Sequence, residues 1–329
     1  MSASGRLLLS FQREEQSITD ATGRVKITEQ IKMHHDFIIN TYYDSTDINM
    51  KQFFYYLYVI ILTTISCTDH QEQMQNLTVD FNQLDTGKLT DWETKSIWPD
   101  AELVCGKKDY LFYELGITPH PHFIAEENSN RFLKVLIPER HYGPIVGAQW
   151  KFPITPNEEY YFSYRVKFAN GFDFVKGGKL PGLAGGAANS GGHVPSGYDG
   201  WSARMMFWEN GKLSYYLYFP NQSSQWGERL YLKNMQGDTL KIERGKWHTI
   251  TQHIKMNTPQ KKDGIIQAWF DGQEAFSVDT ILFRNDKKLQ IDQIFYSVFM
   301  GGDDLSWTSA KDEYIYFDDF HVSPQKIKP

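Results

Sequence analysis

The chain has 329 residues, which is enough for one large β domain or two small ones. Its formal net charge of -6, from 34 basic and 40 acidic residues, argues against a nucleic-acid-binding protein. A local cluster of cations can still bind an anionic substrate inside a cleft. Aromatic residues make up 15% of the chain, and long helical patterns are scarce after residue 76, so an all-β domain is favoured. The two cysteines, Cys67 and Cys105, exclude a disulfide-rich framework.

Residues 50–67 resemble a secretory signal. A lysine follows Met50, and an apolar run from Phe53 to Leu62 leads to a small residue just before Cys67. The run is shorter than the ~20 apolar residues that a membrane-spanning helix needs, and its parts match an export signal. Its end resembles a bacterial lipoprotein signal, in which the cysteine carries the lipid. We therefore expect a protein of the cell envelope or the extracellular space, most simply an outer-membrane lipoprotein held by lipid on Cys67.

The segments around this signal follow from its position. A signal normally begins a chain, and here it begins at Met50. Residues 1–49 are therefore interpreted as upstream sequence translated in error, with a disordered cytoplasmic tail as the alternative. The polar residues 68–75 are interpreted as a tether. Residues 76–329 contain no internal repeat and no linker, so they are expected to form one domain.

Short segments of alternating apolar and polar residues follow one another from Asn76 onward. Such regular short strands between turn signals are typical of a sandwich or jelly roll. We predict an all-β fold, a β-jelly roll that is a concanavalin-like β-sandwich of two antiparallel sheets. The expected strands are 77–81, 132–137, 160–168, 201–208, 213–219, 247–256, 265–270, 293–300 and 314–322.

Residues 201–219 predict a β-hairpin with two different faces. Every odd position of the first strand, from Trp201 to Phe207, is apolar, and so is every odd position from Leu213 to Phe219. Side chains alternate faces along a strand, so the odd set faces the core and the even set faces outward. The even set includes Ser202 and Arg204 on the first strand and Ser214, Tyr216 and Tyr218 on the second.

The loop length fixes which residues face each other. Both odd sets point to one face only if the loop has three residues, Glu209-Asn210-Gly211, with Gly211 in a left-handed conformation. In that register Arg204 lies opposite Tyr216, and Ser202 lies opposite Tyr218. A hydroxyl, a guanidinium and two phenols then share one patch. The alternative is a solvated sheet face with scattered polar residues.

A glycine-rich segment, residues 176–200, precedes the hairpin. It lacks the spacing of a nucleotide-binding loop, and no helix follows it. Its glycines permit close backbone approach and unusual dihedral angles. Lys176 and Lys179 add positive charge beside the hairpin.

Several separated motifs, in order, resemble polysaccharide lyase family 14. They are GGKLPGL at 177–183, SAR at 202–204 and YLY at 216–218, followed by longer stretches at 245–272 and 295–320. The resemblance is strong over 145–322 and weaker over 76–144. It implies a β-jelly-roll enzyme that cleaves a uronate polysaccharide, chiefly alginate and in some members glucuronan.

The resemblance also implies the site residues. The family's functional lysine, serine, arginine and two tyrosines fall on Lys179, Ser202, Arg204, Tyr216 and Tyr218. One departure is the alanine at 184, where an aromatic residue often follows the motif, and this implies a possible change in subsite preference.

The implied reaction removes the C5 proton of a uronate and expels the C4 oxygen. Charge that develops on the carboxylate needs cations or strong donors aimed at it, and Arg204 and Lys179 supply them. Tyr216 and Tyr218 are the candidates for proton acceptor and donor, provided that nearby cations lower the tyrosine pKa from its usual value of about 10. Ser202 would orient the substrate or a tyrosine. The division of roles between the tyrosines stays open.

Three further residues are predicted to contact substrate. His193 lies in the glycine-rich segment, Lys176 adds charge beside it, and Trp226 lies in a polar stretch where it can stack on a sugar. No cofactor and no metal is expected, and the expected partner of this monomer is an anionic uronate polysaccharide.

Two other functions compete with the lyase. A non-catalytic glycan-binding module on the cell surface could use the same cleft. A glycoside hydrolase would need paired carboxylates, and no closely spaced pair of glutamates stands near the patch. The preference among mannuronate, guluronate and glucuronate, and the choice of endo or exo action, also stay open.

Overall fold

Antiparallel strands make up most of the part of the chain that the computed structural model describes, residues 76–98, 100–103, 121–144 and 148–327. The strands are Leu77–Val79 (β1), Gly87–Lys88 (β2), Glu102–Leu103 (β3), His122–Glu127 (β4), Asn130–Ile137 (β5), Ala148–Asn157 (β6), Glu159–Phe168 (β7), Gly177–Gly186 (β8), Gly200–Trp208 (β9), Leu213–Tyr218 (β10), Glu228–Tyr231 (β11), His248–Lys255 (β12), Gly264–Phe270 (β13), Gln273–Ile281 (β14), Ile291–Met300 (β15) and Glu313–Ser323 (β16). The helix Asp91–Ile97 (α4) and the short 3-10 turns Glu209–Gly211 (η2) and Leu305–Trp307 (η3) complete the elements.

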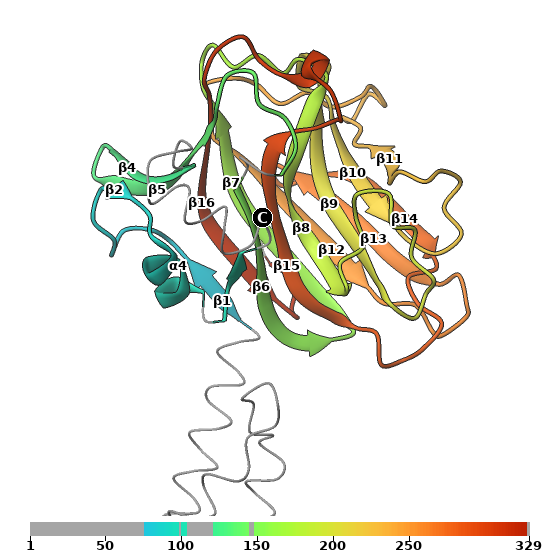
Figure 1. Cartoon of the computed structure of the whole chain (residues 1–329). Helices are drawn as coiled ribbons and strands as arrows, with labels where there is room; N and C mark the ends of the chain where they lie inside the picture. The colour runs from blue at the N-terminus through green and yellow to red at the C-terminus, as the bar shows by residue number, and fades with distance from the viewer. Residues whose placement is uncertain (1–75, 99, 104–120, 145–147, 328–329) are drawn as a thin grey trace, which may run out of the picture. The chain divides into compact units, whose positions relative to one another are not determined.

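The described strands form two antiparallel sheets that lie as layers (Figure 1). One sheet has nine strands, in the order β14-β13-β12-β7-β16-β5-β4-β2, with β1 paired to β16. The other has seven, in the order β11-β10-β9-β8-β15-β6-β3. The predicted sandwich of two antiparallel sheets is confirmed. The strands β8 to β11, which follow one another in sequence, lie side by side at one end of the smaller sheet.

The core between the sheets is rich in aromatic residues. Tyr164 from the larger sheet and Tyr215 from the smaller one are both fully buried. Each phenol donates a hydrogen bond across the layer, to the carbonyl of Pro181 at 3.3 Å and to the carbonyl of Gln267 at 2.6 Å. A buried hydroxyl without a partner is costly, so these bonds help to fix how the two sheets stack.

Every strand predicted from alternation is present, with bounds that shift by a few residues. The first half of the glycine-rich segment is the inner strand β8, which was not among the predicted strands. Glycine weakens a strand unless close backbone packing requires it. Gly182 shows such packing, since a Cβ there would meet the backbone oxygen of Ala203 and the Cα of Arg204 on β9.

The interpretations of residues 1–49, 50–67 and 68–75, and of lipid on Cys67, concern residues outside the described ranges. In the described ranges, no helix combines the length and the apolar character that a bilayer-crossing helix requires.

Candidate active site

The hairpin β9–β10 has the predicted register. Arg204 pairs with Tyr216, and Ser202 pairs with Tyr218. The loop has three residues, and Gly211 has a φ of 75°. The amide of Trp208 donates to the carbonyl of Lys212 at 2.8 Å, which closes the loop. The three-residue loop deduced from alternation is therefore confirmed.

The outward face of this hairpin is buried, so its interpretation as a solvated sheet face is wrong. Arg204 is 2% exposed, Tyr216 is 8% exposed, and Ser202 and Tyr218 are fully buried. Loops cover the face. The amide of Gly192 donates to the Tyr218 hydroxyl at 3.1 Å, and a side chain at Gly227 would collide with the Tyr218 ring. The face forms the wall of a cavity of about 830 Å³.

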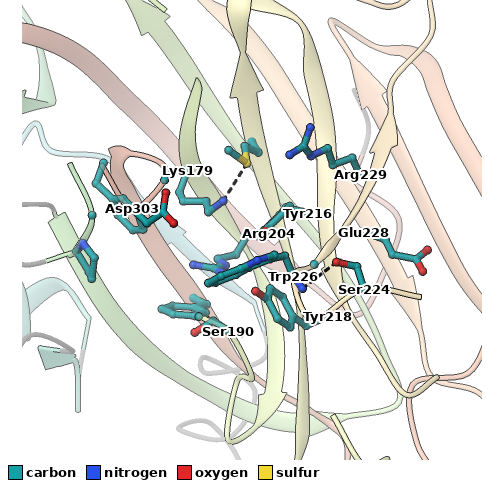
Figure 2. A pocket seen from close by; sticks show the side chains of 18 of the residues that line it. Lys179, Ser190, Arg204, Tyr216, Tyr218, Ser224, Trp226, Glu228, Arg229 and Asp303 are labelled. Atoms are coloured by element: carbon teal, nitrogen blue, oxygen red, sulfur yellow. Dashed lines mark hydrogen bonds between the residues drawn. The ribbon is translucent and has the colours of Figure 1, made fainter. Parts of the chain in front are cut away.

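Lys179 enters this cavity from β8, the neighbour of β9 (Figure 2). It is 7% exposed, and its Nζ lies 3.5 Å from the centre of the Tyr216 ring and 2.9 Å from the Met206 sulfur. No described carboxylate forms an ion pair with it. Burial, followed by the nearby charges of Arg204 and Arg229, holds the pKa of Lys179 well below its usual value. This lowered pKa increases the fraction of Lys179 that is present as the neutral amine near neutral pH.

Arg204 is held from one side only. One terminal nitrogen donates to the Ser297 hydroxyl at 3.2 Å, and that hydroxyl donates to the Gln149 side-chain oxygen at 3.0 Å. The guanidinium carbon lies 4.5 Å from the centre of the Phe295 ring. Its Nε has no hydrogen-bond partner among the described residues. Burial lowers the pKa of Arg204 to about 10, so the guanidinium stays charged at neutral pH.

The two phenols meet edge to face, with ring centres 5.6 Å apart. Burial, followed by the neighbouring Tyr218, raises the pKa of Tyr216, and Arg204 and Arg229 offset this only in part. The expectation that cations lower the tyrosine pKa is therefore wrong for Tyr216. At neutral pH this phenol keeps its proton, which suits a proton donor.

Ser202 does not line the cavity. Its hydroxyl donates to the carbonyl of Asn189 at 2.6 Å, beneath the loop that follows β8. Tyr218 holds the same loop through Gly192. The structure thus makes Ser202 a residue that positions the loop, and the prediction that it orients a tyrosine or the substrate directly is not supported by its contacts.

The three predicted substrate contacts have different positions. Trp226 is 50% exposed and lines the cavity, and its backbone amide donates to the Ser224 hydroxyl at 3.1 Å (Figure 2). Lys176 is exposed and outside the lining, but it donates to Ser306 and lies 5.8 Å from the Trp307 ring centre at the cavity rim. His193 is exposed and does not line the cavity, so its predicted role as a substrate contact is not supported by its position.

Sequence reasoning missed several cavity residues. Arg229 on β11 lines the cavity, and its guanidinium carbon lies 4.0 Å from the centre of the Trp208 ring. Extending the alternation by one more strand would have placed Arg229 on the face of Tyr216. The pairing of Ser297 with Gln149 joins strands far apart in sequence, so no local pattern could reveal it.

The fold and the cavity define a β-sandwich protein with a cleft of buried cations and aromatic rings. The sequence profile of polysaccharide lyase 14 matches residues 125–320, more than half of the chain, and the chain belongs to this family. No curated protein sequence matches it.

Solved structures share this fold. The alginate lyase Aly36B superposes with a TM-score of 0.64 at 22% identity, covering 77% of this chain and 98% of its own. The alginate lyase of Aplysia kurodai gives a TM-score of 0.57 at 23% identity, covering 71% of this chain and 93% of its own. The alginate lyase vAL-1 from Chlorella virus gives 0.51 at 22% identity, covering 61% and 88%.

Proposed function

We propose that this polysaccharide lyase acts on a uronate polysaccharide, with alginate as the foremost candidate, by β-elimination. The observation that carries the proposal is the cavity that holds Arg204, Lys179 and Tyr216 together with no carboxylate paired to either cation among the described residues. Solved structures with the same fold are named alginate lyases, and one of them is a mutant in complex with an alginate tetrasaccharide.

The reaction breaks the C5–H bond of the uronate and the C4–O bond to the next sugar. The electron pair of the C5–H bond forms the C4–C5 double bond, and the C4 oxygen leaves with a proton, so no water is consumed. Negative charge builds up on the carboxylate after the C5 proton is removed and before the C4–O bond breaks. Arg204 lines the cavity and can bind that carboxylate there, and a preorganised charge of this kind stabilises the enolate.

Lys179 and Tyr216 suit the two proton transfers. The lowered pKa of Lys179 supplies a neutral amine that can accept the C5 proton, and the raised pKa of Tyr216 keeps a proton for the leaving oxygen. The two groups are in contact, since the Lys179 nitrogen lies over the Tyr216 ring. Tyr218 is held by Gly192 beside them and is the second candidate for proton donor. Trp226 would stack on a sugar, with Lys176 at the rim.

Ultraviolet absorbance of the new double bond tests this function directly. The protein is incubated with polymannuronate, polyguluronate and glucuronan, and the rates rank the three sugars. Absorbance is expected for at least one of them. Binding without absorbance would favour a glycan-binding module, and reducing ends without absorbance would favour a hydrolase.

Variants then separate the roles. Tyr216→Phe is expected to lower kcat by about 10²–10⁴-fold, and Tyr218→Phe tests the second phenol. Tyr198→Phe is the matched control, because Tyr198 is exposed and does not line the cavity. If both cavity variants keep full activity, the phenols do not transfer protons.

We also propose, from the sequence alone, that a monomer is exported and carries lipid on Cys67. Metabolic labelling with a fatty acid tests the anchor. The label should enter the wild-type chain and be absent from Cys67→Ser, and equal labelling would refute it.

A further inference from the structure

Arg229 continues a row of side chains across three strands. Tyr216 on β10 pairs with Arg204 on β9 to one side and with Arg229 on β11 to the other. Paired residues of neighbouring antiparallel strands share a face, and neighbouring strands lie about 4.8 Å apart. The backbones of the two arginines are therefore separated by about 10 Å, twice that spacing, with Tyr216 between them.

The charge of Arg229 has no acidic partner among the described residues. Its neighbour Glu228 accepts a hydrogen bond from the Ser223 amide instead, at 2.8 Å. Arg229 lies over the Trp208 indole, which is itself fixed by a hydrogen bond from its Nε1 to Ser214 at 2.8 Å. This contact leaves the N–H groups of the exposed Arg229 available for an anion.

Arg229 also acts on the other cations. Its charge, with that of Arg204, disfavours the protonated form of Lys179. Three basic side chains thus face one cavity, where the acidic lining residues are Glu228 and Asp303. Such a cluster weakens the fold through repulsion, and bound anions remove that cost. Figure 2 shows Arg229 and Lys179 on one side of the cavity, with Tyr218 and Ser190 on the other.

The two guanidinium groups lie over different rings, Arg204 over Phe295 and Arg229 over Trp208, and Tyr216 holds the paired position between them. We infer that Arg229 binds the carboxylate of a second uronate, next to the sugar that reacts at Arg204. The substrate class is then a polymer with consecutive uronates, as opposed to one in which uronates alternate with neutral sugars. This inference rests on the proposed function and adds a specificity-determining residue to the same cavity.

Steady-state kinetics of Arg229→Gln on two substrates test the inference. On a homopolymer of uronates, KM should rise about tenfold, the effect of losing one charge-assisted hydrogen bond at a partly solvated site. On a polymer with alternating neutral sugars, wild type and variant should agree within about twofold, since no second carboxylate is present to bind. Lys262→Gln, an exposed cation outside the cavity, is the control and should leave both unchanged.

Further measurements distinguish a role of Arg229 in substrate binding from a role in the fold. Arg229→Lys keeps the charge and should recover part of the lost affinity. Removal of the charge should also move the acidic limb of the kcat/KM profile to higher pH, because Lys179 loses a neighbour that disfavours its protonation. Circular dichroism should show the same fold for all variants.

The kinetic results distinguish failure of the Arg229 site from failure of the lyase function. An unchanged KM in an active enzyme, or an equal rise on both polymers, overturns the second-carboxylate site and leaves the lyase function intact. If the wild type forms no double bond, the lyase function fails. Calorimetric binding of a uronate tetrasaccharide then decides about Arg229: weaker binding by the variant supports the site, and equal binding overturns it.

Discussion

Replacing Lys179 with methionine should make the protein more stable and greatly lower its activity. The ammonium group is buried without a carboxylate partner, near two other cations. Methionine has a similar length and no charge, so the replacement removes the desolvation cost of an unpaired amino group. The contact of Lys179 with the Tyr216 ring opposes this by about 0.5–2 kcal/mol. The net gain should raise Tm by roughly 2–4 °C for each kcal/mol.

The gain should depend on pH in a defined direction. The pKa of Lys179 is lower in the folded protein than in the unfolded chain, so the unfolded chain binds more protons between the two values. Wild-type stability from this group therefore rises with pH, and the penalty disappears above the unfolded lysine pKa of about 10.4. The difference in Tm between Lys179→Met and wild type should be larger at neutral pH than at pH ~10, where it should approach zero.

Thermal unfolding and the double-bond assay are measured on the same samples. Activity should fall by about 10²–10⁴-fold, the usual contribution of a positioned base. Lys262→Met, an exposed lysine outside the cavity, should change neither property. A variant that is less stable than wild type would show that Lys179 supports the fold, and a variant that keeps its activity would show that Lys179 does not take part in the reaction.

Three further predictions concern neighbouring features. Ser297→Ala removes the partner of Arg204, so kcat/KM should fall about tenfold, and an unchanged kcat/KM would show that this bond does not position the guanidinium. Tm should fall as well, because the buried Gln149 oxygen also loses its donor. Gly182→Ala puts a methyl group against the next strand and should cost about 1–3 kcal/mol in urea unfolding, whereas an unchanged midpoint would contradict the close packing. The kcat/KM profile should rise with pH as Lys179 loses its proton, at a pH well below the usual lysine value. It should decline only at pH ~10 and above, where Arg204 loses its charge and, at still higher pH, Tyr216 ionises, and a decline near neutral pH would exclude these roles.

The alternation of apolar and polar residues predicted most of the strands and the register of the hairpin. The pairing of Arg204 with Tyr216 follows from the requirement that apolar residues of both strands share the core face. Burial of the opposite face did not follow, because it depends on loops such as those at Gly192 and Gly227, whose positions no period encodes.

The electrostatics of the site could not be predicted from residue types. Nearby cations suggested a lowered tyrosine pKa, but the burial of Tyr216 outweighs them. The same burial lowers the pKa of Lys179, which turned an expected fixed charge into a candidate base. Both shifts depend on how deeply loops and strands enclose the cavity, which is a property of the whole fold.

The mass of the products tests the central claim most directly. After digestion of alginate, a β-elimination leaves each new non-reducing end one water lighter than hydrolysis would, with a C4–C5 double bond. We predict that every new non-reducing end formed by wild type and by Lys262→Met is unsaturated, and that Lys179→Met forms such ends about 10²–10⁴-fold more slowly. New saturated ends from the wild type, or an intact polymer, would contradict the account.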